Sequence, residues 1–348
     1  MKHKEFAFKI SKGMVNDFYV ASNLKPMGIN DFDKPTRTIF CEASKLLKSK
    51  NKLGEKKYSS FEIESTISKE SFLLIDGGWL PAAYPINEYN LIDRNLMSEI
   101  KRHITGGDSS FYGWLNLMKD FNKKYSVIFS ALEKNFSTSK DRKQYFTDFF
   151  DDEKDIADFL SDESVFRIDS DFRNMAFDFI RERRSENIVK FLIESVPLIK
   201  NMWPKNKRYE VASKIFSLAK KYSVEKNKHP LILCLSVLYS ENLNNDYARK
   251  IVKPGGGEKI YTEKDAYNCI NDTIFIDLIM LAKRRLNSEF CGITLDKNLA
   301  KYWCALNPKL LENQDALVSY SFNHYSKDLF NSASPKELKY IYENIGNI

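Results

Sequence analysis

The chain lacks the long apolar runs and paired cysteines that mark membrane and disulfide-rich proteins. In its 348 residues no stretch approaches about 18 apolar residues, so we expect no membrane-spanning helix. Lysines interrupt the apolar start MKHKEFAFKISKGM, which does not resemble a secretory signal. The five cysteines are odd in number, widely spaced and without a CxxC pair: Cys41, Cys234, Cys269, Cys291 and Cys304. We expect a soluble cytoplasmic protein with buried thiols.

Histidine is scarce, and familiar nucleotide or nucleophile motifs are missing. The four histidines (His3, His103, His229 and His324) show no ligand spacing, which argues against a zinc site and histidine acid/base catalysis. The segment KPGGGE at 253–258 lacks the Lys-Ser/Thr of a P-loop and the G-x-G-x-x-G spacing, so we interpret it as a linker. No G-x-S-x-G or Cys/His signature indicates a nucleophilic hydrolase.

The net charge of +7 is concentrated at the N-terminus. Residues 1–57 contain 13 Lys/Arg and 6 Asp/Glu, whereas the remaining residues contain 41 of each. A basic segment of this kind attracts phosphate groups, although lysine is common throughout the chain. The charge pattern therefore indicates nucleic acid as a partner of the N-terminal segment.

The hydrophobic pattern predicts two regions with a boundary near residue 85. Hydrophobic residues make up 43% of the chain, enough for a large core. In residues 1–85 we predict a helix over 38–57 that stops at a lysine-rich stretch, two strands around residues 68–71, and a loop over 77–85. This region would be a basic N-terminal α+β extension.

Residues 86–348 predict an α/β domain that is mostly helical. A strand in NEYNLID and another in FCGITLD (290–296) each precede a helix. Apolar spacings of three and four predict helices over 110–136, throughout 141–250, and at 265–287, 297–306 and 335–345. Carboxylates at the ends of the two strands would meet at the edge of the sheet where ligands bind.

Four acidic residues form the candidate site. Asp93 and Asp296 end the two strands, Asp277 interrupts an apolar helix in FIDLIMLA, and Glu133 lies in FSALEKNF. A charge among apolar residues is costly unless it is paired. Several converging carboxylates typically bind Mg²⁺ or Mn²⁺, which prefer oxygen ligands.

These residues resemble the PIN-domain nucleases. The family's first motif, a strand ending in Asp with Asn or Ser two residues later, is matched by Asp93 and Asn95 in LIDRN. The third motif, an Asp opening an apolar helix, is matched by Asp277 in DLIMLAKR. The fourth, Thr-x-Asp on a short strand, is matched by Thr294 and Asp296 in ITLDKNL, 19 residues after the third.

The resemblance covers about residues 87–135 and 262–305 and implies a PIN-like three-layer core with a short parallel sheet. Glu133 fits the family's second motif, an acidic residue on a helix, and Glu99 is an alternative. The 144 residues from Glu133 to Asp277 exceed what such a domain needs. We therefore predict a PIN-like domain over 86–348 with a helical insertion at about 141–250.

The resemblance further implies a Mg²⁺- or Mn²⁺-dependent nuclease, with RNA favoured over DNA as substrate. Asp93, Asp277 and Asp296 would bind the metal, with Glu133 completing the site and Asn95 and Thr294 supporting it. Related enzymes act as endoribonuclease toxins or in antiviral defence, which implies an inhibitor or partner protein.

Simpler interpretations of these residues stay open. Asp93 and Asp296 each precede a helix and can act only as caps. Asp76 also ends an apolar run, although Gly77 and Gly78 follow it. Asp272 is about 140° from Asp277 around the helix and is interpreted as an N-terminal helix charge, or as an accessory ligand. The competing hypothesis is a non-catalytic helical scaffold that binds a protein or nucleic acid.

Overall fold

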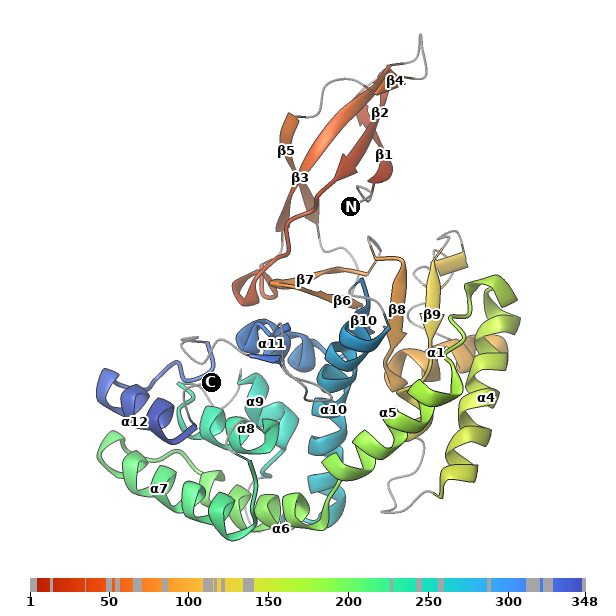
Figure 1. Ribbon diagram of the computed structural model, residues 1–348. Helices are drawn as coiled ribbons and strands as arrows, with labels where there is room; N and C mark the ends of the chain where they lie inside the picture. The colour runs from red at the N-terminus through yellow and green to blue at the C-terminus, as the bar shows by residue number, and fades with distance from the viewer. Residues whose placement is uncertain are drawn as a thin grey trace.

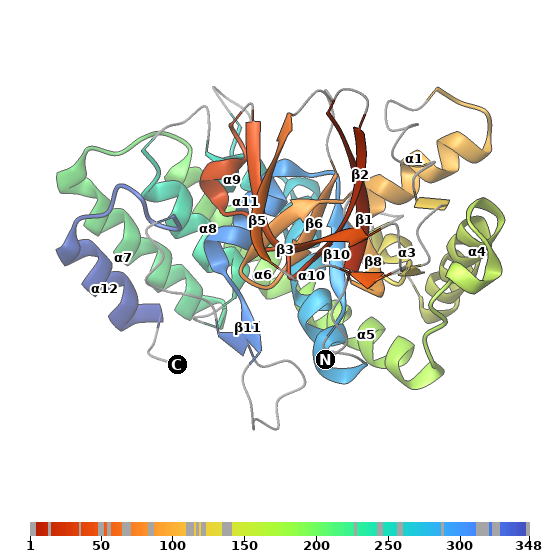
Figure 2. The same ribbon diagram turned by 90° about the horizontal axis from the view of Figure 1, so that it is seen from above.

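The computed structural model describes residues 5–12, 15–34, 36–47, 52–53, 57–64, 71–82, 87–108, 115, 118–119, 123–133, 141–225, 228–241, 246–255, 260–286, 289–310, 320–321 and 328–345. An N-terminal sheet projects from a body in which helices surround a second, central sheet (Figure 1). Seen from above, helices lie on both sides of that central sheet (Figure 2).

The N-terminal sheet is antiparallel. Its strands are β1 (Glu5–Lys12), β2 (Val15–Ser22), β3 (Thr36–Leu47), β4 (Lys52–Leu53) and β5 (Lys57–Glu64). β1 pairs with β2, β2 pairs with β3, and β3 also pairs with β4 and β5. In the described part of residues 1–64, the 3₁₀ turn η1 (Ile29–Asp31) is the only helical element.

The helix predicted over residues 38–57 is wrong, because β3 begins at Thr36 and continues to Leu47. Buried and more exposed residues alternate along its first half: Ile39 and Cys41 are buried, whereas Phe40 is 52% exposed. A period of two residues belongs to a strand. Among the lysines that suggested a helix end, Lys45 lies in β3 and Lys52 lies in β4.

The central sheet has the order β7-β6-β10-β8-β9. Its strands are β6 (Phe72–Ile75), β7 (Gly78–Pro81), β8 (Tyr89–Ile92), β9 (Lys124–Ser126) and β10 (Cys291–Thr294). β8 is parallel to both β9 and β10, whereas β6 is antiparallel to β10 and β7. The α/β class predicted from the sequence is confirmed, and the sheet is mixed.

The strand order reverses beside β8. The chain leaves β8 through α1 (Arg94–Ile104) to β9, and a bridge between Tyr125 and Val165 extends the parallel part in the same direction. It later returns to the opposite side of β8 as β10. The carboxyl ends of β8 and β10 therefore flank a switch point, where open α/β sheets bind their ligands.

The loop predicted over residues 77–85 is wrong in its first part, since Gly78–Pro81 forms β7. Ile75 pairs with Gly78, which leaves Asp76 and Gly77 as a two-residue hairpin turn. Gly77 has φ +82°, a value that glycine adopts readily. Asp-Gly between apolar runs is a strong hairpin signal that the sequence analysis missed.

Pairing across the sheet also corrects the expected organisation. β6 pairs with β10, so the change from the N-terminal sheet to the central sheet lies between Glu64 and Phe72, ahead of the predicted boundary. The helix predicted over 110–136 is interrupted by β9, whose Tyr125 pairs with Asn90 of β8. The short helix α3 (Ser130–Glu133) follows.

Helices occupy most of residues 142–252, as the apolar spacing predicts. They are α4 (Arg142–Phe159), η2 (Asp162–Ser164), α5 (Ser170–Arg183), α6 (Glu186–Ser195), η3 (Val196–Ile199), α7 (Lys205–Lys221), α8 (His229–Leu238) and α9 (Tyr247–Val252). The remaining elements are α10 (Glu263–Arg285), α11 (Lys297–Leu306), α12 (Pro335–Ile345) and the paired strands β11 (Lys309–Leu310) and β12 (Tyr320–Ser321). Because α4 packs on α1 and α3, the start of the predicted insertion belongs to the layer beside the sheet.

Helix α10 runs through the centre of the body. It packs against β10, α5, α6, α8, α9 and α11, and nearly all of its residues from Ala266 to Lys283 are buried or half-buried. A helix surrounded on all sides is hydrophobic on all sides. Asp277 on α10 is buried and Asp272 is half-buried, so each needs a partner or a raised pKa.

The segment after β2 ties the N-terminal sheet to the body. The backbone N–H and C=O of Met27 pair with those of Trp79 in β7, at 2.9 and 3.0 Å. The indole of Trp79 donates to the carbonyl of Gly28 at 3.0 Å, and Phe32 stacks on the same ring at 4.3 Å between centroids. The segment after β2 thus forms an extra edge of the central sheet.

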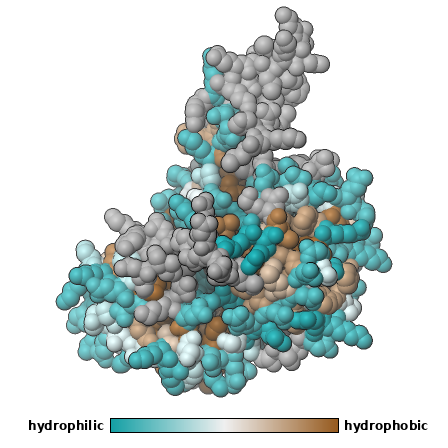
Figure 3. Space-filling view, in the orientation of Figure 1, coloured by the Kyte–Doolittle hydropathy of each residue, from teal (hydrophilic) through white to brown (hydrophobic). Residues whose placement is uncertain are grey.

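Among the described helices, none combines the length and the apolar character needed to cross a bilayer. On the face seen in Figure 3, hydrophobic residues form patches between hydrophilic ones. All five cysteines are free thiols; four are buried, and Cys304 is half-buried.

Candidate carboxylate site

Asp93 follows β8 and caps α1. Its Oδ1 accepts the backbone N–H of Asn95 at 2.5 Å, and its Oδ2 accepts the hydroxyl of Thr294 at the end of β10. The residue is only 3% exposed. Burial raises the pKa of Asp93 to about 6; the charge of Asp296 adds to this rise, and the hydrogen bond from Thr294 opposes it. Asp93 is thus joined to the neighbouring parallel strand by a side-chain contact.

Asp296 has the matching position after β10. It caps α11, with Oδ1 accepting the N–H groups of Asn298 at 2.7 Å and Leu299 at 3.1 Å. Its own N–H donates to Oγ1 of Thr294 at 2.9 Å. The Thr294 hydroxyl therefore links the carboxylate of Asp93 to the backbone N–H of Asp296. The capping interpretation of Asp93 and Asp296 describes real contacts.

The third acid of this group is Asp272 on α10. Burial raises the pKa of Asp272 to about 8; the charges of Asp296 and Asp93 add to this rise, and that of Lys253 opposes it. The Oδ2 atom of Asp272 is buried and accepts no hydrogen bond from any described residue. Asp272 as a whole is half-buried, but its Oδ2 is enclosed, so protonation or a bound cation would stabilise this carboxyl group.

Asp277, which the sequence analysis placed with Asp93 and Asp296, lies in a different cluster. Its Oδ2 is 3.5 Å from Nε of Arg183 on α5, and its Oδ1 is 3.5 Å from Nε2 of His229 on α8. The other ring nitrogen of His229 is 3.0 Å from the hydroxyl of Tyr302. Protein groups therefore surround the Asp277 carboxylate, and Asp272 replaces it beside the strand ends.

Helix geometry explains why Asp272, and not Asp277, lies near the strand ends. Gly292 of β10 lies against Phe275 and Ile279, at the level of Asp277 along α10. A helix before a parallel strand runs antiparallel to it, so its earlier residues approach the strand's carboxyl end. Four strand residues span about 13 Å and five helix residues about 7.5 Å. Asp272 is therefore the acid on α10 nearer to Asp296.

The other acids considered from the sequence do not join this group among the described side chains. Glu133 ends α3, but its side chain lies outside the described part of the structure. Glu99 accepts a hydrogen bond from Arg102 at 2.8 Å. Asp76, in the hairpin turn, pairs with the buried Lys283 of α10 at 2.5 Å.

The site fits a hydrated hard cation better than a fully protein-bound one. Within the described residues, no three His, Cys, Asp or Glu side chains approach closely enough to bind one ion together. Mg²⁺ commonly binds one or two carboxylates and keeps several waters. The buried Oδ2 of Asp272 and the mutual charge effects of Asp93, Asp272 and Asp296 suit such an ion.

The basic N-terminal region is anchored beside this site. Asp33 pairs with Lys297 at 2.8 Å and with Lys301 at 2.7 Å, both on α11, which begins directly after Asp296. Hydrogen bonds from the two ammonium groups lower the pKa of Asp33 to about 2. The segment before β3 thus contacts the first turns of the helix that Asp296 caps.

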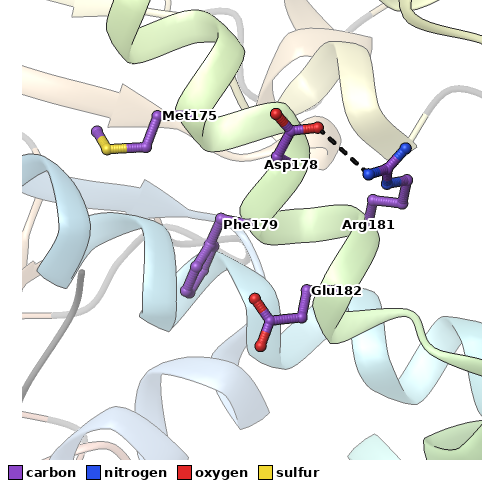
Figure 4. Close-up of a pocket in the computed structure, with 5 residues that line it drawn as sticks. All are labelled: Met175, Asp178, Phe179, Arg181 and Glu182. Atoms are coloured by element: carbon purple, nitrogen blue, oxygen red, sulfur yellow. Dashed lines mark ion pairs between the residues drawn. The ribbon is translucent and has the colours of Figure 1, made fainter. Parts of the chain in front are cut away.

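A separate surface hollow lies on α5 (Figure 4). It measures about 550 Å³ and is lined by Met175, Asp178, Phe179, Arg181 and Glu182. Asp178 and Arg181 form an ion pair at 3.7 Å across its rim. All five residues belong to one helix, and none belongs to the carboxylate group, so we assign the hollow no role.

Comparisons with protein-family models, with curated proteins and with solved structures found no match for this chain.

Proposed function

We propose that this protein is a divalent-cation-dependent phosphodiesterase of PIN-like type, with RNA as its substrate. One observation supports the proposal: Asp93 and Asp296 follow two adjacent parallel strands, near enough to Asp272 for their charges to raise its pKa, and the Oδ2 of Asp272 is buried without a donor among the described residues. The strand order reverses at this point, which is the usual ligand position in an α/β sheet.

Each residue of the group has a distinct part. Asp93, Asp272 and Asp296 would hold a hydrated Mg²⁺ or Mn²⁺, at least one of them through the ion's waters, and the bound ion would activate water and offset the negative charge of a phosphate. The Thr294 hydroxyl and the Asn95 N–H orient the two oxygens of Asp93. Glu133 stays the predicted fourth acid.

The proposed substrate follows from charge. The excess positive charge of the chain lies in residues 1–57, and Asp33 anchors this segment beside Asp296 through Lys297. A polyanion attracted by this basic segment would thereby be brought toward the carboxylate edge. The resemblance to PIN-domain nucleases implies an endoribonuclease that acts as a toxin or in defence, controlled by an inhibitor protein; these roles stay predictions.

The test is cleavage of a labelled single-stranded RNA in the presence of Mn²⁺ or Mg²⁺. We expect Asp272→Asn and Asp296→Asn to reduce the rate at least about 100-fold, because each removes a charged metal ligand. Asp277→Asn is the matched control from the same helix and should retain cleavage, provided that circular dichroism shows it folded. Equal rates for wild type and Asp272→Asn, or no cleavage by wild type with either metal, would refute the proposal.

The competing hypothesis is a non-catalytic scaffold, and the capping contacts of Asp93 and Asp296 favour it. Metal binding separates the two. A cation that binds only the folded state at 100 times its Kd adds about 2.7 kcal/mol to the free energy of unfolding. We expect Mn²⁺ to stabilise wild type and Asp277→Asn but not Asp272→Asn, whereas a scaffold would show the same small effect in all three.

A further inference from the structure

The backbone of Lys253, at the C-terminal end of α9, has an uncommon conformation. Its φ of 54° and ψ of 54° lie in the left-handed region, and its N–H donates to the carbonyl of Arg249 at 2.8 Å. This conformation costs a non-glycine residue about 1 kcal/mol, and glycine is the usual residue at such a helix end. Gly255 lies only two residues later. A lysine kept in a strained position beside a candidate site indicates a functional constraint.

Lys253 lies beside the carboxylate group. Helix α9 packs against α10 and α11, the helices that carry Asp272 and Asp296. The ammonium of Lys253 is near enough to lower the pKa of Asp272 against the effect of burial. The side chain is nevertheless exposed, and none of the described carboxylates forms an ion pair with it. Its ammonium group is therefore accessible to a ligand that binds from solvent.

We propose that Lys253 binds a phosphate group of a nucleic acid strand that crosses the carboxylate edge. Lysine supplies a compact positive charge with three donors, which suits a phosphate oxygen. Beyond the buried Pro254, Gly255 has φ +76° and no side chain, so a phosphodiester backbone can approach the chain closely here. The inference rests on the proposed function, because a phosphate held here would lie next to the three acids.

The experiment measures binding of a short fluorescein-labelled single-stranded RNA by anisotropy, with Ca²⁺ in place of Mn²⁺ and over a series of salt concentrations. We expect Lys253→Ala and Lys253→Gly to weaken binding about tenfold, and the slope of log affinity against log salt to become shallower by about 0.7. Lys253→Gly keeps the left-handed backbone and separates charge from strain. Lys253→Arg should restore most of the affinity.

Lys250→Ala is the matched control, since Lys250 is an exposed lysine on the same helix and is not among the charges that shift the pKa of Asp272. It should change the affinity less than twofold. Wild-type affinity and slope in Lys253→Ala, equal losses in the two lysine variants, or no RNA binding by wild type would each overturn the assignment.

Stabilisation by Mn²⁺, measured in parallel, distinguishes the two proposals. It should persist in Lys253→Ala, because this residue is not a metal ligand. If wild type binds RNA through Lys253 but neither binds Mn²⁺ nor cleaves, the proposed catalysis fails while the phosphate site stands.

Discussion

Asp272 shows at the level of one residue how neighbours set the chemistry of a side chain. Its charge is opposed by burial and by two other carboxylates, and Lys253 offsets only part of this, so its pKa rises to about 8. The neighbours come from β8, α9 and α11, far apart along the chain. A sequence can identify the acid, but the packing of these elements determines its protonation.

A pH dependence of stability follows from this pKa. Because the folded-state pKa of Asp272, about 8, exceeds the ordinary value of 3.8, the folded chain keeps a proton that the unfolded chain releases. The free energy of unfolding therefore falls as the pH rises between these values, by up to about 1.4 kcal/mol per pH unit from this group. Asp272→Asn lacks this loss, so in metal-free buffer its stability relative to wild type should increase with pH.

Urea unfolding of both proteins at about pH 5, 6.5 and 8 measures this difference. Asp277→Asn is again the control, because Arg183 and His229 flank that carboxylate. Parallel pH curves for wild type and Asp272→Asn would show that the pKa of Asp272 is not raised.

The contact between α10 and β10 determines, at the level of elements, which acids meet. Gly292 allows the two elements to lie close together, since a Cβ at this position would be 2.3 Å from Cδ1 of Ile279 and 3.0 Å from Phe275. All three residues are buried. The close packing holds α10 in the register that brings Asp272 toward the carboxyl end of β10.

Replacing Gly292 tests this packing. Gly292→Ala should lower the free energy of unfolding by about 1–3 kcal/mol, because the added methyl overpacks a filled core. Ile279→Val removes the atom that the new methyl meets and alone should cost about 0.5–1.5 kcal/mol. The double variant should lose less free energy of unfolding than the two single variants lose together. Urea unfolding of all four proteins in a double-mutant cycle measures this difference. Additive losses would mean that Ile279 does not limit the approach.

At the scale of the whole molecule, the excess positive charge and the carboxylate group lie in different regions. The excess of basic residues lies within residues 1–57, the region that includes strands β1 to β4 of the projecting N-terminal sheet, whereas the carboxylate group lies at the central sheet (Figure 1). The contacts of Met27 with Trp79 and of Asp33 with Lys297 join the two regions. This arrangement suits a surface that gathers a polyanion and an edge that acts on it.

Neutralising lysines in β1 tests this division of roles. Lys9→Gln with Lys12→Gln should weaken RNA binding and make the salt slope shallower by up to about 1.4, or about 0.7 for each lost phosphate contact. Lys207→Gln with Lys214→Gln removes the same charge from α7, where both lysines pair with Glu210, and should leave the slope unchanged. Anisotropy over a salt series compares the two pairs, and equal effects would indicate attraction by net charge alone.

Features that depend on neighbouring residues could be predicted from the sequence. The strand before Asp93, the helix after it, the helix capped by Asp296 and the helices between 142 and 252 follow from periodicity and capping, which act within a few residues. β3 and β9 could not be separated from helices in this way, because short apolar runs fit both patterns and partner strands decide between them.

The tertiary structure alone decided which carboxylates meet. Local sequence favoured Asp277, the acid with the more apolar surroundings, yet Arg183 and His229 flank it, and Asp272 lies with Asp93 and Asp296. The sequence by itself determined that acids would end both β8 and β10. Which acid of α10 joins them depends on the position of the helix along the sheet. The close contact at Gly292 determines this position.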